Sequence, residues 1–161
     1  MPSRFLLQTL GGLTLSACDS GSSVLVNQRK RLAFVAALAV EAKGGVSRER
    51  LFALFWSESD TERARNALNQ MVFAVRRDLG DDVISGDAVS IRLNPGVIDS
   101  DVRLFRDAVA SGRFADAIDA YRGPFLDGVF LRDTPEFERW VEDVRHAMAV
   151  DYVRGLERET S

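Results

Sequence analysis

The spacing of hydrophobic and polar residues predicts a chain that begins with short strands and continues mainly as helices. Apolar stretches at residues 5–10, 13–17 and 23–26 are separated by a Gly-Gly pair and by a polar turn cluster. Stretches of this length bounded by turn residues predict strands. Paired strands would give the helices that follow a sheet to cover.

Two helices are predicted after these strands. Residues 28–42 begin with three basic side chains and are then apolar on nearly every side, as expected of a central helix. Gly44 and Gly45 would end this helix. Ser47 is expected to cap a shorter second helix, which ends near Trp56.

A third helix is predicted at residues 61–79, with Thr61 as its cap and Gly80 just beyond its end. At about 100° per residue, one narrow face of this helix is apolar and predicts contact with the core. The residues of this inner face are Leu68, Val72, Val75 and Leu79.

The opposite face of the third helix carries side chains of the types that can read DNA bases. Asn and Gln pair with adenine, Arg pairs with guanine or grips phosphate, and an exposed Phe can meet a thymine methyl group. Ala74 is also expected to point outward, beside Phe73. The candidate DNA contacts on this helix are Arg63, Asn66, Asn69, Gln70, Phe73, Arg76 and Arg77.

The period changes to that of strands after the third helix. Residues 83–84 and 89–93 lie on either side of a Ser-Gly-Asp turn and predict a hairpin, with a short return through residues 97–98 after an Asn-Pro-Gly turn. A short helix, a four-residue loop, a longer helix with a polar face and a hairpin form the winged helix-turn-helix order. Arg92, in mid-strand, is the predicted contact of the wing with DNA.

The remainder of the chain is predicted to be helical, with a helix pair from residue 101 and a long helix beginning near Pro135. The long helix has an apolar stripe, and no later helix is predicted that could cover it. This stripe could fold back on the preceding helices, form a dimer surface, or show that the chain is a fragment of a larger regulator. The stripe consists of Phe137, Trp140, Val141, Val144, Met148 and Tyr152.

Several phrases of the sequence resemble the SARP-like branch of transcription activators, which carry an OmpR-type winged helix. In the first part they are LQTLGGL at 7–13, QRKRL at 28–32, SRERL at 47–51 with Trp56 beyond it, and VRRDLG at 75–80. In the second part they are AYRGPFL at 120–126 and FERW at 137–140, which resemble the start of a bacterial transcriptional activator domain with TPR-like helix pairs.

The resemblance implies an α+β fold with two parts. Residues 1–100 would be an OmpR-type winged helix with an N-terminal antiparallel sheet and a C-terminal wing at 83–93, and residues 101–161 a short TPR-like helical segment. It also implies double-stranded DNA as partner, homodimers arranged head to tail on DNA, and a contact with RNA polymerase. The candidate polymerase-contact loop is Ser57, Glu58, Ser59 and Asp60.

Composition limits the other functions that the chain could have. The net charge is −3, but residues 1–100 carry 12 Lys and Arg against 11 Asp and Glu, so the acidic excess lies in the second part. One cysteine and one histidine exclude a cysteine-based zinc site and a histidine-pair site. The glycine pairs lack the spacing of phosphate-binding loops. We therefore expect no enzyme activity, no cofactor and no metal site.

The N-terminal stretch has a second interpretation. Arg4 precedes an apolar segment that ends in Leu15-Ser16-Ala17-Cys18, which resembles the cleavage box of an exported lipoprotein. Polar residues and glycines interrupt that segment, so two strands are the favoured interpretation. No segment approaches the roughly 20 apolar residues of a membrane span. We expect a cytoplasmic protein without a membrane partner.

Two functions follow as hypotheses. The first is a sequence-specific DNA-binding transcription regulator, in the first instance an activator, that reads the major groove with helix 61–79 and the backbone or minor groove with the wing. The second is a protein-interaction adapter that keeps the winged-helix fold and has lost DNA binding, which the negative net charge and Phe73 favour.

Overall fold

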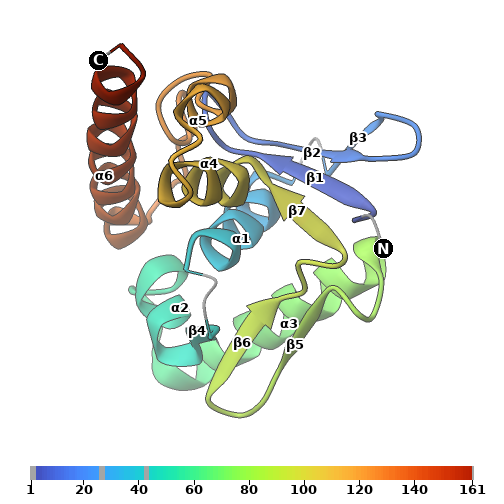
Figure 1. Ribbon diagram of the computed structural model, residues 1–161. Helices are drawn as coiled ribbons and strands as arrows, with labels where there is room; N and C mark the ends of the chain where they lie inside the picture. The colour runs from blue at the N-terminus through green and yellow to red at the C-terminus, as the bar shows by residue number, and fades with distance from the viewer. Residues whose placement is uncertain (1–2, 26–27, 42–43, 161) are drawn as a thin grey trace.

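The computed structural model describes residues 3–25, 28–41 and 44–160, and it confirms an α+β fold in the predicted order of elements (Figure 1). The strands are β1 (Phe5–Gln8), β2 (Thr14–Ala17), β3 (Ser23–Val24), β4 (Val46–Ser47), β5 (Ile84–Gly86), β6 (Ser90–Leu93) and β7 (Ile98–Ser100). The helices are α1 (Arg29–Val40), α2 (Arg48–Phe55), α3 (Thr61–Leu79), α4 (Asp101–Ala110), α5 (Phe114–Ala120) and α6 (Pro135–Glu159). Residues 26 and 42, predicted as element ends, lie outside the described residues.

The first sheet has the order β3-β2-β1-β7, and it corrects two predictions. β7 runs parallel to β1, so the N-terminal sheet is mixed and not purely antiparallel. Residues 97–98 therefore do not return to the hairpin. An edge strand leaves backbone N–H and C=O groups unpaired. The chain after Pro95 supplies partners along the open edge of β1. At the start of this pairing, Arg4 and Phe5 donate their N–H groups to the Val97 carbonyl at 2.9 and 3.0 Å.

The second sheet is the wing, with the order β4-β6-β5. The predicted hairpin is confirmed as the antiparallel pair β5–β6. β4 was not predicted, because two residues are too few to show a period. It pairs Val46 with Ile91 and thereby joins the wing directly to the start of α2.

The starts of α2 and α3 follow ordinary capping chemistry, and the cap of α3 corrects a prediction. Ser47 Oγ accepts the N–H of Arg50 at 3.0 Å, as predicted for the cap of α2. The cap of α3 is Asp60 and not Thr61, because Asp60 Oδ1 accepts the N–H of Arg63 at 2.8 Å. Asp is among the most favourable N-cap residues and ranks above Thr. Gly80 follows α3 with φ +114°, a conformation that favours glycine.

The core is continuous from Leu7 to Met148 and is centred on α1, which is buried along residues 32–38. It includes side chains on both sides of residue 100, so no break in packing marks that point. α4 packs on α1 and β1, and α6 packs on both α5 and α2 (Figure 1). The division into parts at residue 100 stays a prediction, and the described packing joins them.

Asp101 is one of the groups that join the helical segment to the first sheet. Its carboxylate is buried and accepts the N–H groups of Thr9 and Leu10, each at 2.8 Å, and the Thr9 hydroxyl at 2.9 Å. Burial raises the pKa of Asp101, and the bonds from Leu10 and Thr9 oppose that rise. β1 ends at Gln8 because the next two amides bond to this carboxylate instead of a neighbouring strand.

A second junction brings together two of the phrases that carried the family resemblance. Gly11 donates its N–H to the Pro124 carbonyl at 2.9 Å, and Leu126 donates to the Thr9 carbonyl at 2.8 Å. A Cβ on Gly123 would lie 3.0 Å from the Gly11 Cα, which explains two glycines at this crossing. Residues 7–13 and 120–126 are therefore in direct contact.

The apolar stripe of α6 folds back on the molecule, which was one of the three alternatives. Phe137 lies with its ring 5.1 Å from that of Phe55 of α2. Trp140 donates its indole N–H to Glu41 Oε1 at 2.8 Å. Tyr152 stacks on Tyr121 with 4.1 Å between ring centroids. The start of α6 thus packs on the winged-helix part, through Phe137 and Trp140, and its later turns pack on the helical part, through Tyr152.

Candidate nucleic-acid interface

α3 is an amphipathic helix, and its two faces are as distinct as the sequence predicted. The predicted inner residues are all buried, together with Ala64 and Ala74. The outward position expected for Ala74 is wrong, because its side chain is only 7% exposed. Six of the seven candidate DNA contacts on α3 are exposed, namely Arg63, Asn66, Asn69, Gln70, Phe73 and Arg77.

Arg76, the seventh, is held differently. Its side chain is partly buried, and Nη2 donates to the Ile84 carbonyl of β5 at 2.8 Å. α3 and the wing are therefore joined by this guanidinium. The geometry assigns Arg76 to the support of the wing, behind the exposed surface that the other six residues form.

Arg77 is exposed but has an acidic neighbour. Its Nε lies 3.1 Å from Asp78 Oδ1, and the other oxygen of Asp78 accepts from Arg31 Nη1 at 3.0 Å. Arg31 belongs to the basic start of α1, and its neighbour Lys30 lies over the Trp56 ring at 5.2 Å. Two of the three cations at this helix start therefore make contacts within the protein.

The wing presents both a cation and an acidic tip. Arg92 is exposed on β6, between the buried Ile91 and Leu93, and its Nε donates to Ser85 Oγ at 3.4 Å. Asp87 lies at the tip, where the backbone N–H groups of Ser90 and Val89 lower its pKa. Val89 beside it is 72% exposed. The wing thus presents an exposed arginine on β6 and a tip that keeps its negative charge.

Arg48 is a residue of this surface that sequence reasoning did not single out. It is the first residue of α2, and its Nε donates to the Asp87 carbonyl at 2.9 Å. Its Nη1 donates to Asn69 Oδ1 at 3.3 Å. An arginine at a helix start has no distinguishing pattern. Only the fold brings it to partners 21 and 39 residues further along the chain.

A hollow of about 550 Å³ lies along α3, between the start of α2 and the turn that follows α3. The hollow is lined by three polar candidates of α3 and by Arg48, and Asp81 adds an acidic group. The lining residues are Arg48, Asn69, Val72, Phe73, Arg76, Arg77 and Asp81. Phe73, which is 68% exposed, is the largest apolar group at this surface.

The candidate polymerase-contact loop connects α2 to α3 and is exposed at all four positions, Ser57, Glu58, Ser59 and Asp60. Asp60 also has the structural task of capping α3, and it pairs with Arg63 at 3.7 Å. A change at Asp60 would therefore alter the helix as well as the loop.

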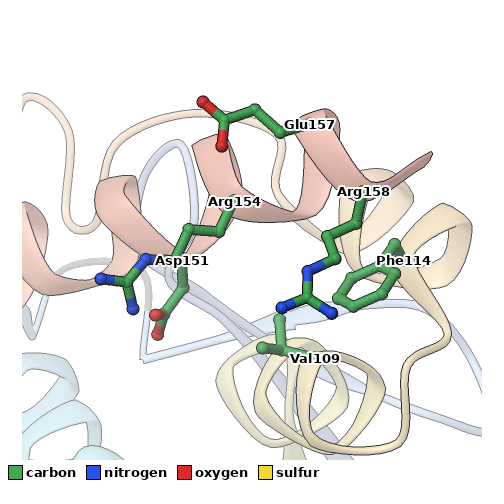
Figure 2. Close-up of a pocket in the computed structure, with 6 residues that line it drawn as sticks. All are labelled: Val109, Phe114, Asp151, Arg154, Glu157 and Arg158. Atoms are coloured by element: carbon green, nitrogen blue, oxygen red, sulfur yellow. The ribbon is translucent and has the colours of Figure 1, made fainter. Parts of the chain in front are cut away.

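A different hollow, of about 510 Å³, lies among α4, α5 and the end of α6 (Figure 2). Figure 2 shows Arg158 reaching over the Phe114 ring, whereas Glu157 points away from it. The end of α6 and the wing lie at opposite ends of the molecule in Figure 1. This hollow contains none of the predicted site residues.

Comparison with solved structures finds a protein with a similar fold. EmbR of Mycobacterium tuberculosis, in a complex with a low-affinity phosphopeptide, superposes with a TM-score of 0.67 at 23% sequence identity, over 98% of this chain. The chain therefore shares the fold of the matched part of EmbR. It spans 46% of the EmbR chain. No protein-family model and no curated protein matches the sequence.

Two further searches concern other kinds of site. Within residues 3–25, 28–41 and 44–160, no helix is both long and apolar enough to cross a lipid bilayer. Over the same described residues, no three His, Cys, Asp or Glu side chains gather as a metal site would require. Cys18 is free and exposed, just beyond the end of β2.

Proposed function

We propose that the chain is a sequence-specific DNA-binding transcription regulator, in the first instance an activator, with no enzyme activity of its own. The observation that carries this proposal is the outer face of α3. Arg63, Asn66, Gln70 and Arg77 are exposed together on a helix whose other face is buried, beside a wing. This is the arrangement in which a helix enters the major groove and a wing reaches the adjacent backbone.

The charge of the surface supports modest affinity for one chain. Exposed arginines at 63, 65, 77 and 92 are interspersed with Glu62, Asp81 and Asp87. Each phosphate contact steepens the loss of affinity with salt, so a surface with few cations has a shallow slope. We therefore propose that two copies bind head to tail on repeated half-sites, with loop 57–60 toward RNA polymerase.

The test is duplex DNA binding as a function of salt. Fluorescence anisotropy with a random duplex pool should show binding at low salt, with affinity falling as salt rises. Arg77→Ala combined with Arg92→Ala should weaken binding by about 100-fold, since each lost arginine contact costs about 1–3 kcal/mol. The matched control, Arg113→Ala with Arg154→Ala, removes two exposed charges near the hollow at the end of α6 and should bind as the parent does.

A second candidate function is a protein-interaction adapter with this fold. The observation that favours it is Phe73, which is 68% exposed in the middle of the face, together with the Asp78 carboxylate beside Arg77. The same titration separates the two functions. A parent chain that binds no duplex at low salt, or a double variant that binds like the parent, would reject the regulator and leave the adapter.

A further inference from the structure

The structure ties three elements of the candidate interface together through one side chain. Arg48 opens α2, directly after β4, and its backbone N–H donates to the Val89 carbonyl at 2.9 Å. Its guanidinium donates from Nε to the Asp87 carbonyl at 2.9 Å. From Nη1 it donates to Asn69 Oδ1 on α3 at 3.3 Å. The start of α2, the wing tip and α3 thus share one planar group.

This contact has a consequence for the Asn69 carboxamide. A free carboxamide can turn over and exchange its acceptor with its donor. In Asn69 the acceptor Oδ1 is directed to Arg48, so the donor Nδ2 takes the other position of the carboxamide and points away from Arg48. Asn69 is exposed beside the hollow that Phe73 and Arg77 also line.

We propose that Arg48 is a positioning residue, which holds the Asn69 carboxamide in one orientation and the wing tip in register with α3. Its effect on base reading rests on the proposed DNA binding. A donor directed at the major groove suits the N7 acceptor of purines, the O6 of guanine and the O4 of thymine, whereas cytosine presents an amino donor there. Asn69 therefore discriminates against cytosine at one base position, because Arg48 keeps the carboxamide donor directed at the DNA.

The first measurement uses the free protein and needs no DNA. In nitrogen–proton spectra the Asn69 side-chain amide and the backbone amides of residues 87–90 report the contact. Arg48→Ala should shift the Asn69 pair and speed exchange with water at the wing tip. Arg48→Lys should do the same, because an ammonium keeps the charge but not the planar fork.

The control is Arg139→Ala, which removes an exposed charge on α6, where Arg139 pairs with Glu136 at 3.3 Å, and should leave these signals unchanged. Circular dichroism checks that each variant is folded. If both Arg48 variants are folded and keep the parent values for the Asn69 amide and the wing tip, the positioning role is rejected.

The second measurement selects bound duplexes from a random library. Asn69→Ala identifies the base position that Asn69 reads, and Arg48→Ala should lower discrimination against cytosine at that position by about tenfold, the lower range for one base contact. The two changes together should cost no more than Asn69→Ala alone. Additive effects, or a change at other positions only, would overturn the inference. Failure of the parent to select any sequence would reject the DNA-binding function, and the free-protein spectra would still decide the contact.

Discussion

At the scale of single residues, the candidate interface contains a charge that works against its proposed task. Asp78 accepts from Arg31 at 3.0 Å and lies 3.1 Å from Nε of Arg77. Arg77 must give up part of this pairing to reach a phosphate or a guanine. Because exposed ion pairs contribute about 0–1 kcal/mol, Asp78 adds little stability while it lowers the positive potential of the face.

Asp78→Asn should therefore tighten DNA binding. The amide keeps the shape of the side chain, removes one negative charge and releases Arg77 toward DNA. We expect affinity to rise about threefold to tenfold at low salt, and the slope of log affinity against log salt to steepen by about 0.9 for one added phosphate contact.

The measurement is the anisotropy titration at several salt concentrations. Asp116→Asn is the matched control, since Asp116 pairs with Arg113 on the surface of α5 at 3.3 Å. It should leave both affinity and slope unchanged. Affinity of Asp78→Asn at or below that of the parent would show that Arg77 takes no part in binding.

At the scale of elements, the sequence predicts what depends on local periods. The two faces of α3 follow from the helical repeat, and the β5–β6 hairpin follows from alternation around a turn. Ala74 shows the limit of this reasoning. It lies at the side of the apolar stripe, where burial depends on the neighbouring element and not on the helix itself.

Pairing between distant segments could not be predicted in this way. The chain after Pro95 could return to the hairpin or continue to another strand, and residues 97–98 are equally apolar in either case. The open edge of β1 decides between the two, through bonds that join Arg4 and Phe5 to Val97. The link from Arg48 to Asn69 is likewise a product of the fold, since nothing local marks either residue as the partner of the other.

Asp101 permits a direct test of how the helical segment is attached to the first sheet. Asp101→Ala leaves the N–H groups of Thr9 and Leu10 buried without this acceptor. Each unsatisfied group costs about 1–3 kcal/mol, so the free energy of unfolding should fall by about 3 kcal/mol. Asp101→Asn keeps one acceptor oxygen, so its free energy of unfolding should fall by about half as much.

Urea unfolding monitored by circular dichroism measures both Asp101 variants. Asp107→Ala on the exposed side of α4 removes a carboxylate that pairs with Arg103 at the surface, and it should change the free energy of unfolding by less than about 1 kcal/mol. An Asp101→Ala variant with the unfolding midpoint of the parent would show that the carboxylate is not an anchor.

At the scale of the whole molecule, the helical segment is packed as part of the winged helix. α6 contacts α2 as well as α5, and the segments at 7–13 and 120–126 meet backbone to backbone. Arg48 lies at the start of α2 and contacts the wing, and α6 packs against the side of α2. A change in how α6 packs would therefore shift the wing through α2. This gives the segment a physical route to the interface, through α2.

Unfolding should accordingly be one cooperative transition. The chain has two tryptophans, so Trp140→Phe leaves Trp56, at the end of α2, as the fluorescent reporter of the winged-helix part. In this background the urea midpoints of Trp56 fluorescence and of far-ultraviolet circular dichroism should coincide, as expected of two-state unfolding. In the same background, Phe137→Ala empties a buried site between Phe55 and the side chain at position 140. It should lower the free energy of unfolding by about 3–5 kcal/mol and move both midpoints together. Phe130→Ala removes a ring that is 71% exposed and should move neither. A Trp56 transition that stays in place when Phe137 is removed would show that α6 and the winged helix unfold as separate units.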